Sequence, residues 1–368
     1  MKKNDLPTPC LVVDLDKLQR NIDEMARRAR QAGMALRPHV KTHKTPAIAH
    51  LQMKAGAVGI TCAKLGEAEV MASAGIEDIF VAYPIVGADK VERLLNLALW
   101  VPRVSTSVDT LPAARALNAA AIARRQHLDV VAEVDTGYCR TGVAPGEPLL
   151  RLVQELTSMP GLRFKGLMYM AANTARHLEP EKQLAAEQAS ARLATDSATL
   201  LREHGIESEV VGGGGTVGAR YLGQLPGVTE FRAGCYVFGD LQYADLGAHT
   251  REQISLTVLS TVVSVPAVEE PDHLVVDAGS KALTHCPSVT TPGHGTLAAY
   301  PDLHITSASE EHGSIRLPPG VRPPALGSKV DIWPNYVSDT VNLFERMWVI
   351  QNDEVVAGWD IAARGKSV

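Results

Sequence analysis

The chain has 368 residues, of which 45% are hydrophobic and 21% are charged, and its formal net charge is −5. This length leaves room for one large α/β domain and a smaller companion, each around a packed core. The ordinary composition, without long runs of one charge, argues against a nucleic acid or a membrane surface as the partner.

The chain also lacks the marks of a membrane or secreted protein. No apolar run approaches the roughly 18 residues that a membrane helix needs, and the N-terminal residues lead into no signal-type segment. The five cysteines are odd in number and scattered, with no Cys-x-x-Cys spacing. This pattern argues against a disulfide framework and a structural zinc site. We therefore expect a cytoplasmic protein with reduced thiols.

Short β-branched runs alternate with helical patterns from residue 16 to about residue 240, which is typical of βαβ units and a parallel sheet. Eight such units predict an α/β fold, a (β/α)8 TIM-type barrel, whose reactive groups gather at the C-terminal ends of the strands. The predicted helices include residues 16–32, 90–99, 112–125, 147–157 and 181–204. The predicted strands are residues 35–41, 58–63, 79–83, 103–108, 128–135, 164–170, 209–213 and 230–238.

The pattern changes after about residue 240, where strand-like segments with turns between them predict a second, β-rich domain. An extra strand at residues 9–14 precedes the first helix, and we expect this strand to complete the β-rich domain. We predict a barrel domain over residues 15–245 and a β-rich domain made of residues 1–14 plus 246–368. The strands expected in its C-terminal part are residues 254–265, 273–277, 330–333, 347–351 and 354–357.

The first barrel strand ends in Arg-Pro-His-Val-Lys-Thr-His-Lys, residues 37–44. Lys41 lies there beside two imidazoles and a second lysine. Burial and neighbouring positive charge both favour its neutral amine, which is a nucleophile toward aldehydes. Lys41 is therefore our candidate for a Schiff base with pyridoxal 5'-phosphate, a cofactor that supplies an electron sink. The alternative is an ordinary solvated basic patch.

Glycines follow the seventh and eighth predicted strands. Residues 211–216 read Val-Gly-Gly-Gly-Gly-Thr, and residues 233–236 read Ala-Gly-Cys-Tyr. Glycine lets backbone N–H groups close on a phosphate, and the loops after these two strands are the usual phosphate site of such barrels. The alternative is a flexible turn. The candidate phosphate site therefore lies in these two loops, which end with Thr216 and Tyr236.

The fifth predicted strand leads into a loop that contains Asp135 and Arg140. A permanently charged arginine suits the phenolic oxygen of the cofactor, because it holds that oxygen as an anion. The alternative is a structural ion pair between Asp135 and Arg140.

Several motifs agree in order with one known family. The segments are residues 37–44, 133–143 (Glu-Val-Asp-x-Gly-x-x-Arg-x-Gly-Val), 213–216 (Gly-Gly-Gly-Thr), 277–282 (Asp-Ala-Gly-Ser-Lys-Ala) and 309–313 (Ser-Glu-Glu-His-Gly). The chain resembles, over its whole length, the D-threonine aldolase and D-serine dehydratase family, whose barrel is similar to that of alanine racemase.

The resemblance implies a pyridoxal-phosphate enzyme that acts on D-configured β-hydroxy amino acids. It also implies a homodimer with its sites near the subunit interface. Position by position, it implies that Lys41 forms the Schiff base, that Arg140 binds O3′ of the cofactor, and that the phosphate cradle comprises Gly214, Gly215, Thr216, Gly234 and Cys235.

The chain departs from the family at two places. Family members bind a divalent metal, which holds the substrate's β-hydroxyl, through Pro-x-His-x-Asp or Pro-x-His-x-Cys. Here Tyr336 and Ser338 stand at the ligand positions. A neutral phenol and a hydroxyl are poor ligands, so we predict no metal site of the family form. His285, Cys286 and His312 show no ligand spacing that would build another metal site. The favoured interpretation is that the two histidines are ordinary loop residues.

The second departure follows the sixth predicted strand. Relatives place Tyr-Gln-Gly or Tyr-Glu-Gly opposite the cofactor, whereas residues 169–173 here read Tyr-Met-Ala-Ala-Asn. Tyr169 and Asn173 are both candidates for the pyridine nitrogen, and Tyr169 is our choice as a cofactor-binding residue.

These features predict a lyase that cleaves a D-3-hydroxy amino acid by a retro-aldol reaction, with Lys41 as anchor and base. Its small-molecule substrate gives its β-hydroxyl proton to a base, for which His39, His43, His312 and Tyr336 are candidates. Dehydration of D-serine or D-hydroxyaspartate is one alternative, although it normally calls for a Lewis acid. Racemisation, with Tyr336 opposite Lys41, is another. A non-enzymatic cofactor-binding barrel is the third, and the β-rich domain argues against it.

Overall fold

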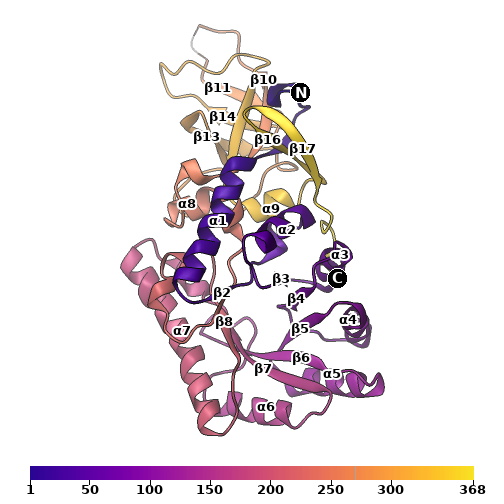
Figure 1. Cartoon of the computed structure of the whole chain (residues 1–368). Coiled ribbons are helices and arrows are strands. Elements are labelled where there is room, and N and C mark those ends of the chain that lie inside the picture. Colours follow the sequence, from indigo (N-terminus) through magenta and orange to yellow (C-terminus); the bar gives the residue numbers. More distant parts are fainter. Residues whose placement is uncertain (270) are drawn as a thin grey trace. The chain divides into compact units, whose positions relative to one another are not determined.

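The computed structural model describes residues 1–269 and 271–368, which divide into two compact units (Figure 1). The β unit contains residues 1–23, 42–45 and 235–364, and the barrel unit contains residues 24–41, 46–234 and 365–368. Helix α1 (Leu15–Gln31) contributes to both. The predicted domain limits, residues 15–245 and residues 1–14 plus 246–368, stay a prediction, because contacts alone do not define an independently folding domain.

The barrel unit contains eight parallel strands in the order β2-β9-β8-β7-β6-β5-β4-β3. His39, just beyond β2, forms a parallel bridge with Thr61 of β3. This bridge joins the two ends of the sheet, so the predicted (β/α)8 barrel is confirmed. The strands are β2 (Ala35–Leu36), β3 (Ile60–Cys62), β4 (Asp78–Val81), β5 (Arg103–Val108), β6 (Leu128–Val134), β7 (Leu162–Tyr169), β8 (Val210–Gly213) and β9 (Glu230–Phe231).

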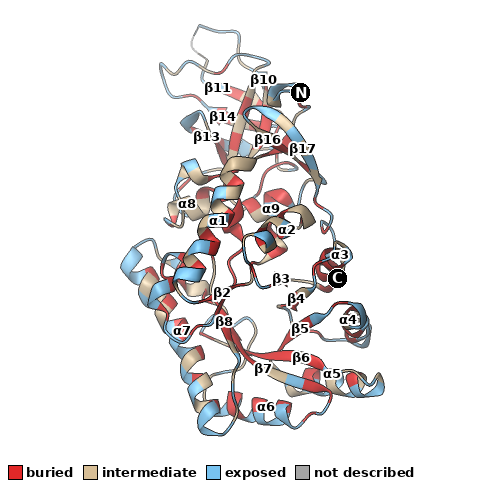
Figure 2. Ribbon diagram, viewed as in Figure 1, coloured by how far each residue is buried: buried red, intermediate tan, exposed pale blue. Residues whose placement is uncertain are grey.

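Helices alternate with these strands, as the sequence pattern predicts. Strand β6 is buried along nearly its whole length, whereas the helices that follow the strands carry both buried and exposed residues (Figure 2). Phe80, Val131 and Met168 pack together in the barrel core. The helices are α2 (Pro46–Lys54), α3 (Leu65–Ser73), α4 (Ala88–Trp100), α5 (Leu111–Ala123), α6 (Glu147–Thr157) and α7 (Pro180–Glu203).

Strands β2 and β9 end much earlier than predicted. The strand expected over residues 35–41 ends at Leu36, and pairing continues only through single bonds such as His39 N–H to the Ala233 carbonyl, at 2.9 Å. Pro38 has no N–H to donate, and the chain then turns into the 3₁₀ helix η2 (Val40–Thr42). The strand expected over residues 230–238 ends at Phe231, before the 3₁₀ helix η6 (Cys235–Val237).

The β unit contains a nine-stranded sheet in the order β11-β14-β13-β12-β15-β10-β1-β16-β17, with a further pairing of β10 with β11 that closes six strands into a ring. The predicted N-terminal strand is confirmed as β1 (Cys10–Asp14), which pairs with β10 and β16. Leu6, Cys10, Val12 and Leu259 form a core cluster there. The other elements are β10 (Leu256–Ser264), β11 (His273–Val276), β12 (Gly295–Leu297), β13 (Tyr300–Ala308), β14 (Gly313–Arg316), β15 (Lys329–Pro334), β16 (Arg346–Gln351), β17 (Glu354–Asp360), α8 (Leu241–Asp245) and α9 (Val337–Val341).

Asp277 ties the N-terminus of the chain to the β unit's sheet. Its carboxylate accepts hydrogen bonds from the hydroxyls of Thr8 and Ser260, each at 2.6 Å, and from the backbone N–H of Thr261 at 2.8 Å. The motif at residues 277–282 therefore begins with a residue that organises the fold.

Among the described residues, no helix combines the length and the apolar character that a membrane crossing requires.

A buried ion cluster lies where strands β4 and β9 begin. The Arg37 guanidinium pairs with Asp78, the first residue of β4, and with Glu230, the first residue of β9, at 2.7 Å. Because reactive groups of such barrels gather at the opposite strand ends, this cluster is expected to serve stability.

We expect the R37M substitution to lower the free energy of unfolding by about 3 kcal/mol, because it leaves two largely buried carboxylates without their shared cation. The matched control is R103M. Arg103 pairs with the same Asp78 at 2.7 Å, but 65% of its side chain is exposed, so the expected loss is below about 1 kcal/mol. Urea denaturation of both variants measures the difference, and equal losses would contradict this interpretation.

Candidate active site

Lys41 lies at the turn that follows the first barrel strand. It is half-buried in η2, and its backbone N–H donates to Nδ1 of His39 at 3.4 Å. Both residues therefore lie at the C-terminal end of the barrel's strands, where such barrels carry their reactive groups. The short helix replaces the strand end that the sequence pattern predicted for Lys41.

The loop after β8 packs its backbone directly against aromatic rings of the barrel. A Cβ at Gly213 would lie 2.4 Å from the Tyr169 ring, and one at Gly214, where φ is +86°, would lie 2.0 Å from the Phe231 ring. A Cβ at Gly215, by contrast, would meet no atom within 4 Å. The loop thus presents open backbone at Gly215, as a phosphate cradle requires.

Tyr169 is the last residue of β7, and only 2% of it is exposed. Its hydroxyl is buried and has no hydrogen-bond partner among the described residues. Burial raises the pKa of Tyr169 well above its usual value, and the negative charge of Glu187 adds to this effect. The phenol is therefore neutral, with a buried hydroxyl in need of a partner.

The side-chain oxygen of Asn173 is buried and has no hydrogen-bond partner in the described part of the chain. Asn173 lies in the 3₁₀ helix η3 (Ala172–Arg176), which follows β7. The open glycine loop and the Tyr169 hydroxyl together fit a phosphorylated pyridine ring. Asn173 stays the alternative to Tyr169 as the partner of the ring nitrogen.

Asp135 and Arg140 have separate surroundings. One oxygen of Asp135 accepts the backbone N–H groups of Gly137, Tyr138 and Cys139 at 2.9, 3.1 and 3.2 Å. Arg140 is exposed, and its guanidinium lies 5.6 Å from the centre of the Tyr138 ring. Within residues 1–269 and 271–368, no ion pair joins Arg140 to Asp135, so Asp135 shapes the loop through backbone bonds.

In the β unit, Thr42, Cys235 and Ser338 form a cluster of two hydroxyls and one thiol. The Cys235 sulfur lies 3.3 Å from the Thr42 hydroxyl and 3.4 Å from the Ser338 hydroxyl, which in turn donates to Thr42 at 3.2 Å. Burial raises the pKa of the Cys235 thiol, and Asp240 adds to that rise. We name these three residues the hydroxyl–thiol cluster.

Tyr336 precedes α9, and its ring centre lies 6.4 Å from that of Tyr243. Burial raises the pKa of the Tyr336 phenol above its usual value, with a further contribution from Cys235. Tyr336, like the hydroxyl–thiol cluster, therefore presents a neutral group.

Asp240 holds the segments that carry these groups. Its two oxygens accept the backbone N–H of Tyr243 at 2.8 Å, within α8, and that of Val337 at 2.9 Å, the first residue of α9. The side chain is fully buried. Burial raises its pKa to about 7, although the two backbone bonds act in the opposite direction.

The remaining predicted residues lie elsewhere in the β unit. His312 is exposed in the turn between β13 and β14, where its carbonyl accepts the N–H of Ser309 at 3.0 Å. His43 is buried and accepts the N–H of Thr45 at 3.1 Å. Tyr236 is buried in η6.

The His285 ring packs edge-on against His294 at 5.4 Å. Across the described residues, no three His, Cys, Asp or Glu side chains are grouped as metal ligands.

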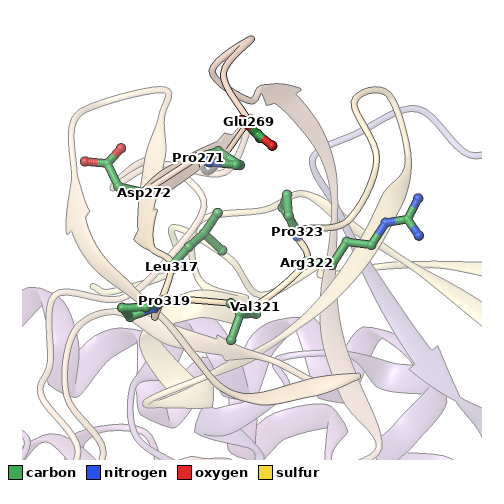
Figure 3. A pocket seen from close by; sticks show the side chains of 9 residues that line it. Glu269, Pro271, Asp272, Leu317, Pro319, Val321, Arg322 and Pro323 are labelled. Atoms are coloured by element: carbon green, nitrogen blue, oxygen red, sulfur yellow. The ribbon is translucent and has the colours of Figure 1, made fainter.

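A separate hollow in the β unit carries none of the predicted site residues (Figure 3). Its walls include Glu269, Asp272, Pro319, Arg322 and Pro323, which come from two loops of this unit.

Family models match both parts of the chain. The model described as the N-terminal domain of alanine racemase matches residues 13–242, and the one described as a putative serine dehydratase domain matches residues 255–350. The chain is 36% identical over 366 residues to the D-threonine aldolase of Arthrobacter sp., covering 98% of this chain and 93% of that protein. The chain belongs to the D-threonine aldolase and D-serine dehydratase family. The resemblance noted in the sequence is thus confirmed.

Two further members of the family are similar over nearly their whole length. The D-threo-3-hydroxyaspartate dehydratase of Delftia sp. (strain HT23) is 32% identical, with 96% of this chain and 97% of that protein covered. The crystal structure of D-threonine aldolase from Filomicrobium marinum matches with a TM-score of 0.92 and 33% identity, covering 100% of this chain and 98% of that one. The fold is therefore that of the family, whose members include both aldolases and dehydratases.

Two buried carboxylic acids, Asp240 and Glu187, were not among the predicted site residues. Asp240 follows a glycine just before a short helix, where an N-cap residue is a recognisable signal. Glu187 lies on the buried face of α7, four residues after the buried Gln183. The signal that could have revealed Glu187 is its spacing from Gln183, which places two polar residues on the same face of the helix.

We expect the D240N substitution to destabilise the protein by about 1–3 kcal/mol, because an amide can accept only one of the two backbone N–H groups and sets its own N–H₂ against the other. The control is D339N, since Asp339 is exposed and accepts a single bond from Thr284 at 3.3 Å. Thermal unfolding of the two variants should show a clear loss only for D240N. A D240N variant as stable as D339N would show that these bonds do not hold the segment.

Proposed function

We propose that this chain is a pyridoxal-phosphate-dependent lyase that cleaves D-3-hydroxy amino acids by a retro-aldol reaction. The observation that supports it most directly is the buried, unpartnered hydroxyl of Tyr169 beside the open glycine loop of the barrel unit. The similarity to D-threonine aldolases supports the substrate class.

Each part of the cofactor has a proposed partner. Gly214, Gly215, Thr216 and Gly234 would hold the phosphate through their backbone. Cys235 and Tyr236 are the other two proposed phosphate-binding residues. Tyr169 would meet the ring nitrogen, and Arg140 the phenolic oxygen. Lys41 would hold the aldehyde carbon covalently. When bound, the cofactor supplies an electron sink for the electron pair released at Cα.

Lys41 is also the proposed base of the reaction. A neutral amine or imidazole takes the proton of the β-hydroxyl, the Cα–Cβ bond breaks, and an aldehyde leaves. His39 lies two residues away and accepts the backbone N–H of Lys41 through Nδ1. Tyr336, whose raised pKa keeps it neutral, is better suited to giving a proton than to taking one. His43 and His312 stay candidates.

We also propose that Tyr336 and Ser338 do not bind a catalytic metal in the family manner. Divalent metals of this kind select imidazole, thiolate and carboxylate ligands. A neutral phenol, a hydroxyl and the protonated Cys235 thiol are poor donors by comparison, and burial keeps the first and the third of these neutral. This donor chemistry favours retro-aldol cleavage over dehydration, since loss of hydroxide depends more on a Lewis acid.

The homodimer and the cytoplasmic location stay predictions.

We expect the purified protein, supplied with the cofactor, to convert D-threonine to acetaldehyde and glycine. K41A should reduce the rate at least about 100-fold, because it removes both anchor and base. K44A, which changes a neighbouring lysine, is the control and should stay active. Chromatography of the products decides the reaction type: ammonia and 2-oxobutanoate would identify a dehydratase, and loss of optical rotation without either product pair would identify a racemase.

Treatment with EDTA followed by dialysis should leave the cleavage rate unchanged, because the proposed mechanism relies on no metal at Tyr336 and Ser338. The measurement is the initial rate on D-threonine before and after chelation. A rate that falls and returns with added Mn²⁺ would contradict the proposal and indicate a metal site built from other residues.

A further inference from the structure

Helix α7 carries a carboxylic acid that no part of the proposed reaction uses. Glu187 is fully buried, and its Oε2 accepts a hydrogen bond from the Thr174 hydroxyl at 2.6 Å. Its other oxygen, Oε1, is buried and has no hydrogen-bond partner within the described residues. Such a group is costly to bury, so it requires an explanation.

The Glu187 carboxyl stands directly against the loop that follows β8. A Cβ placed on Gly218 would lie 2.5 Å from the carboxyl carbon and 2.5 and 2.6 Å from its two oxygens. With a side chain at this position, the Glu187 carboxyl would have to move away. Gly218 begins the 3₁₀ helix η4 (Gly218–Arg220) and follows Gly215 by three residues. The acid thus supports the same loop whose open backbone is the proposed phosphate cradle.

Among the residues that the structure describes, no cation compensates a charge on Glu187. Across residues 1–269 and 271–368, no ion pair includes it. Of the arginines on the two elements packed nearest, Arg220 in η4 donates to Gln183 at 3.3 Å, and Arg176 in η3 lies over the Tyr138 ring. A negative charge on Glu187 raises the pKa of Tyr169 in β7. Ionisation of Glu187 would therefore place an uncompensated negative charge behind the glycine loop.

We propose that Glu187 is a positioning residue for the phosphate of the cofactor: its neutral carboxyl supports the loop at Gly218, and its ionised form repels the phosphate. The proposal rests on the cofactor assignment made under the proposed function. A phosphate group carries a charge of about −1.5 to −2 near neutral pH. Repulsion between two anions is strong in a dry interior, since little solvent screens it.

The ionisation of Glu187 falls in an accessible pH range. Burial raises its pKa to about 7, and the hydrogen bond from Thr174 acts in the opposite direction. Below this pKa the acid is neutral and does not oppose the phosphate, and above it the carboxylate does. Linkage is reciprocal, so a bound phosphate also favours the protonated acid. Cofactor affinity should therefore fall as the pH rises.

The test measures the affinity of the full-length protein, freed of cofactor, for pyridoxal 5'-phosphate and for pyridoxal at several values between about pH 6 and pH 9. For each unit of rising pH, we expect the wild type to lose up to about tenfold more of its affinity for pyridoxal 5'-phosphate than E187Q loses. The two proteins should bind pyridoxal, which has no phosphate, with the same pH dependence. E181Q, an exposed change on the same helix, should behave as the wild type.

A second variant keeps the proposal testable if E187Q does not fold. T174V removes the hydrogen bond that favours the carboxylate, so the loss of affinity should begin at a higher pH than in the wild type. An E187Q variant with the wild-type pH dependence, or a T174V variant with an unshifted one, would overturn the inference. A wild type that binds no pyridoxal 5'-phosphate at any pH would instead overturn the proposed function.

Discussion

The close packing of the glycine loop against the barrel's aromatic side chains is the constraint on which the candidate site depends. Gly213 and Gly214 lie so near the rings of Tyr169 and Phe231 that no side chain fits at either position. The backbone beyond them is open at Gly215, and at Gly218 it lies close to the Glu187 carboxyl. One loop thereby offers open backbone for a phosphate, covers the buried phenol and contacts a buried acid. Any side chain at Gly213 or Gly214 would have to displace an aromatic ring before a cofactor could bind.

In the β unit, burial decides the chemistry by keeping acidic groups protonated. Cys235, Tyr243 and Tyr336 each have a raised pKa, with burial as the largest cause. Asp240 shares this environment while its oxygens hold the backbone of α8 and α9. These groups can donate protons and hydrogen bonds but make weak metal ligands. Under the proposed function, these neutral groups favour a cleavage that needs a base more than a Lewis acid.

Sequence patterns predicted the parts of the fold that arise from local periodicity. The alternation of strands and helices, the glycines after β8 and the N-terminal strand β1 were all visible in them. The early end of β2 was not predicted, although Pro38, which has no N–H to donate, is a local signal for it. Glu187 was not predicted, because polar residues on a helix usually face solvent. The role of Asp277, which joins Thr8 to Ser260, depends on contacts between residues far apart in the chain, and no local pattern encodes such contacts.

We propose that Lys41, and no other lysine, holds pyridoxal phosphate. The most direct measurement is borohydride reduction of the protein loaded with the cofactor, followed by proteolysis and mass spectrometry of the peptides. Reduction converts a lysine–aldehyde linkage into a stable amine, so the cofactor stays attached to the lysine that held it. We expect the added mass of the reduced cofactor on the peptide that contains Lys41. Its presence on a different lysine, or its absence from every peptide, would contradict the account.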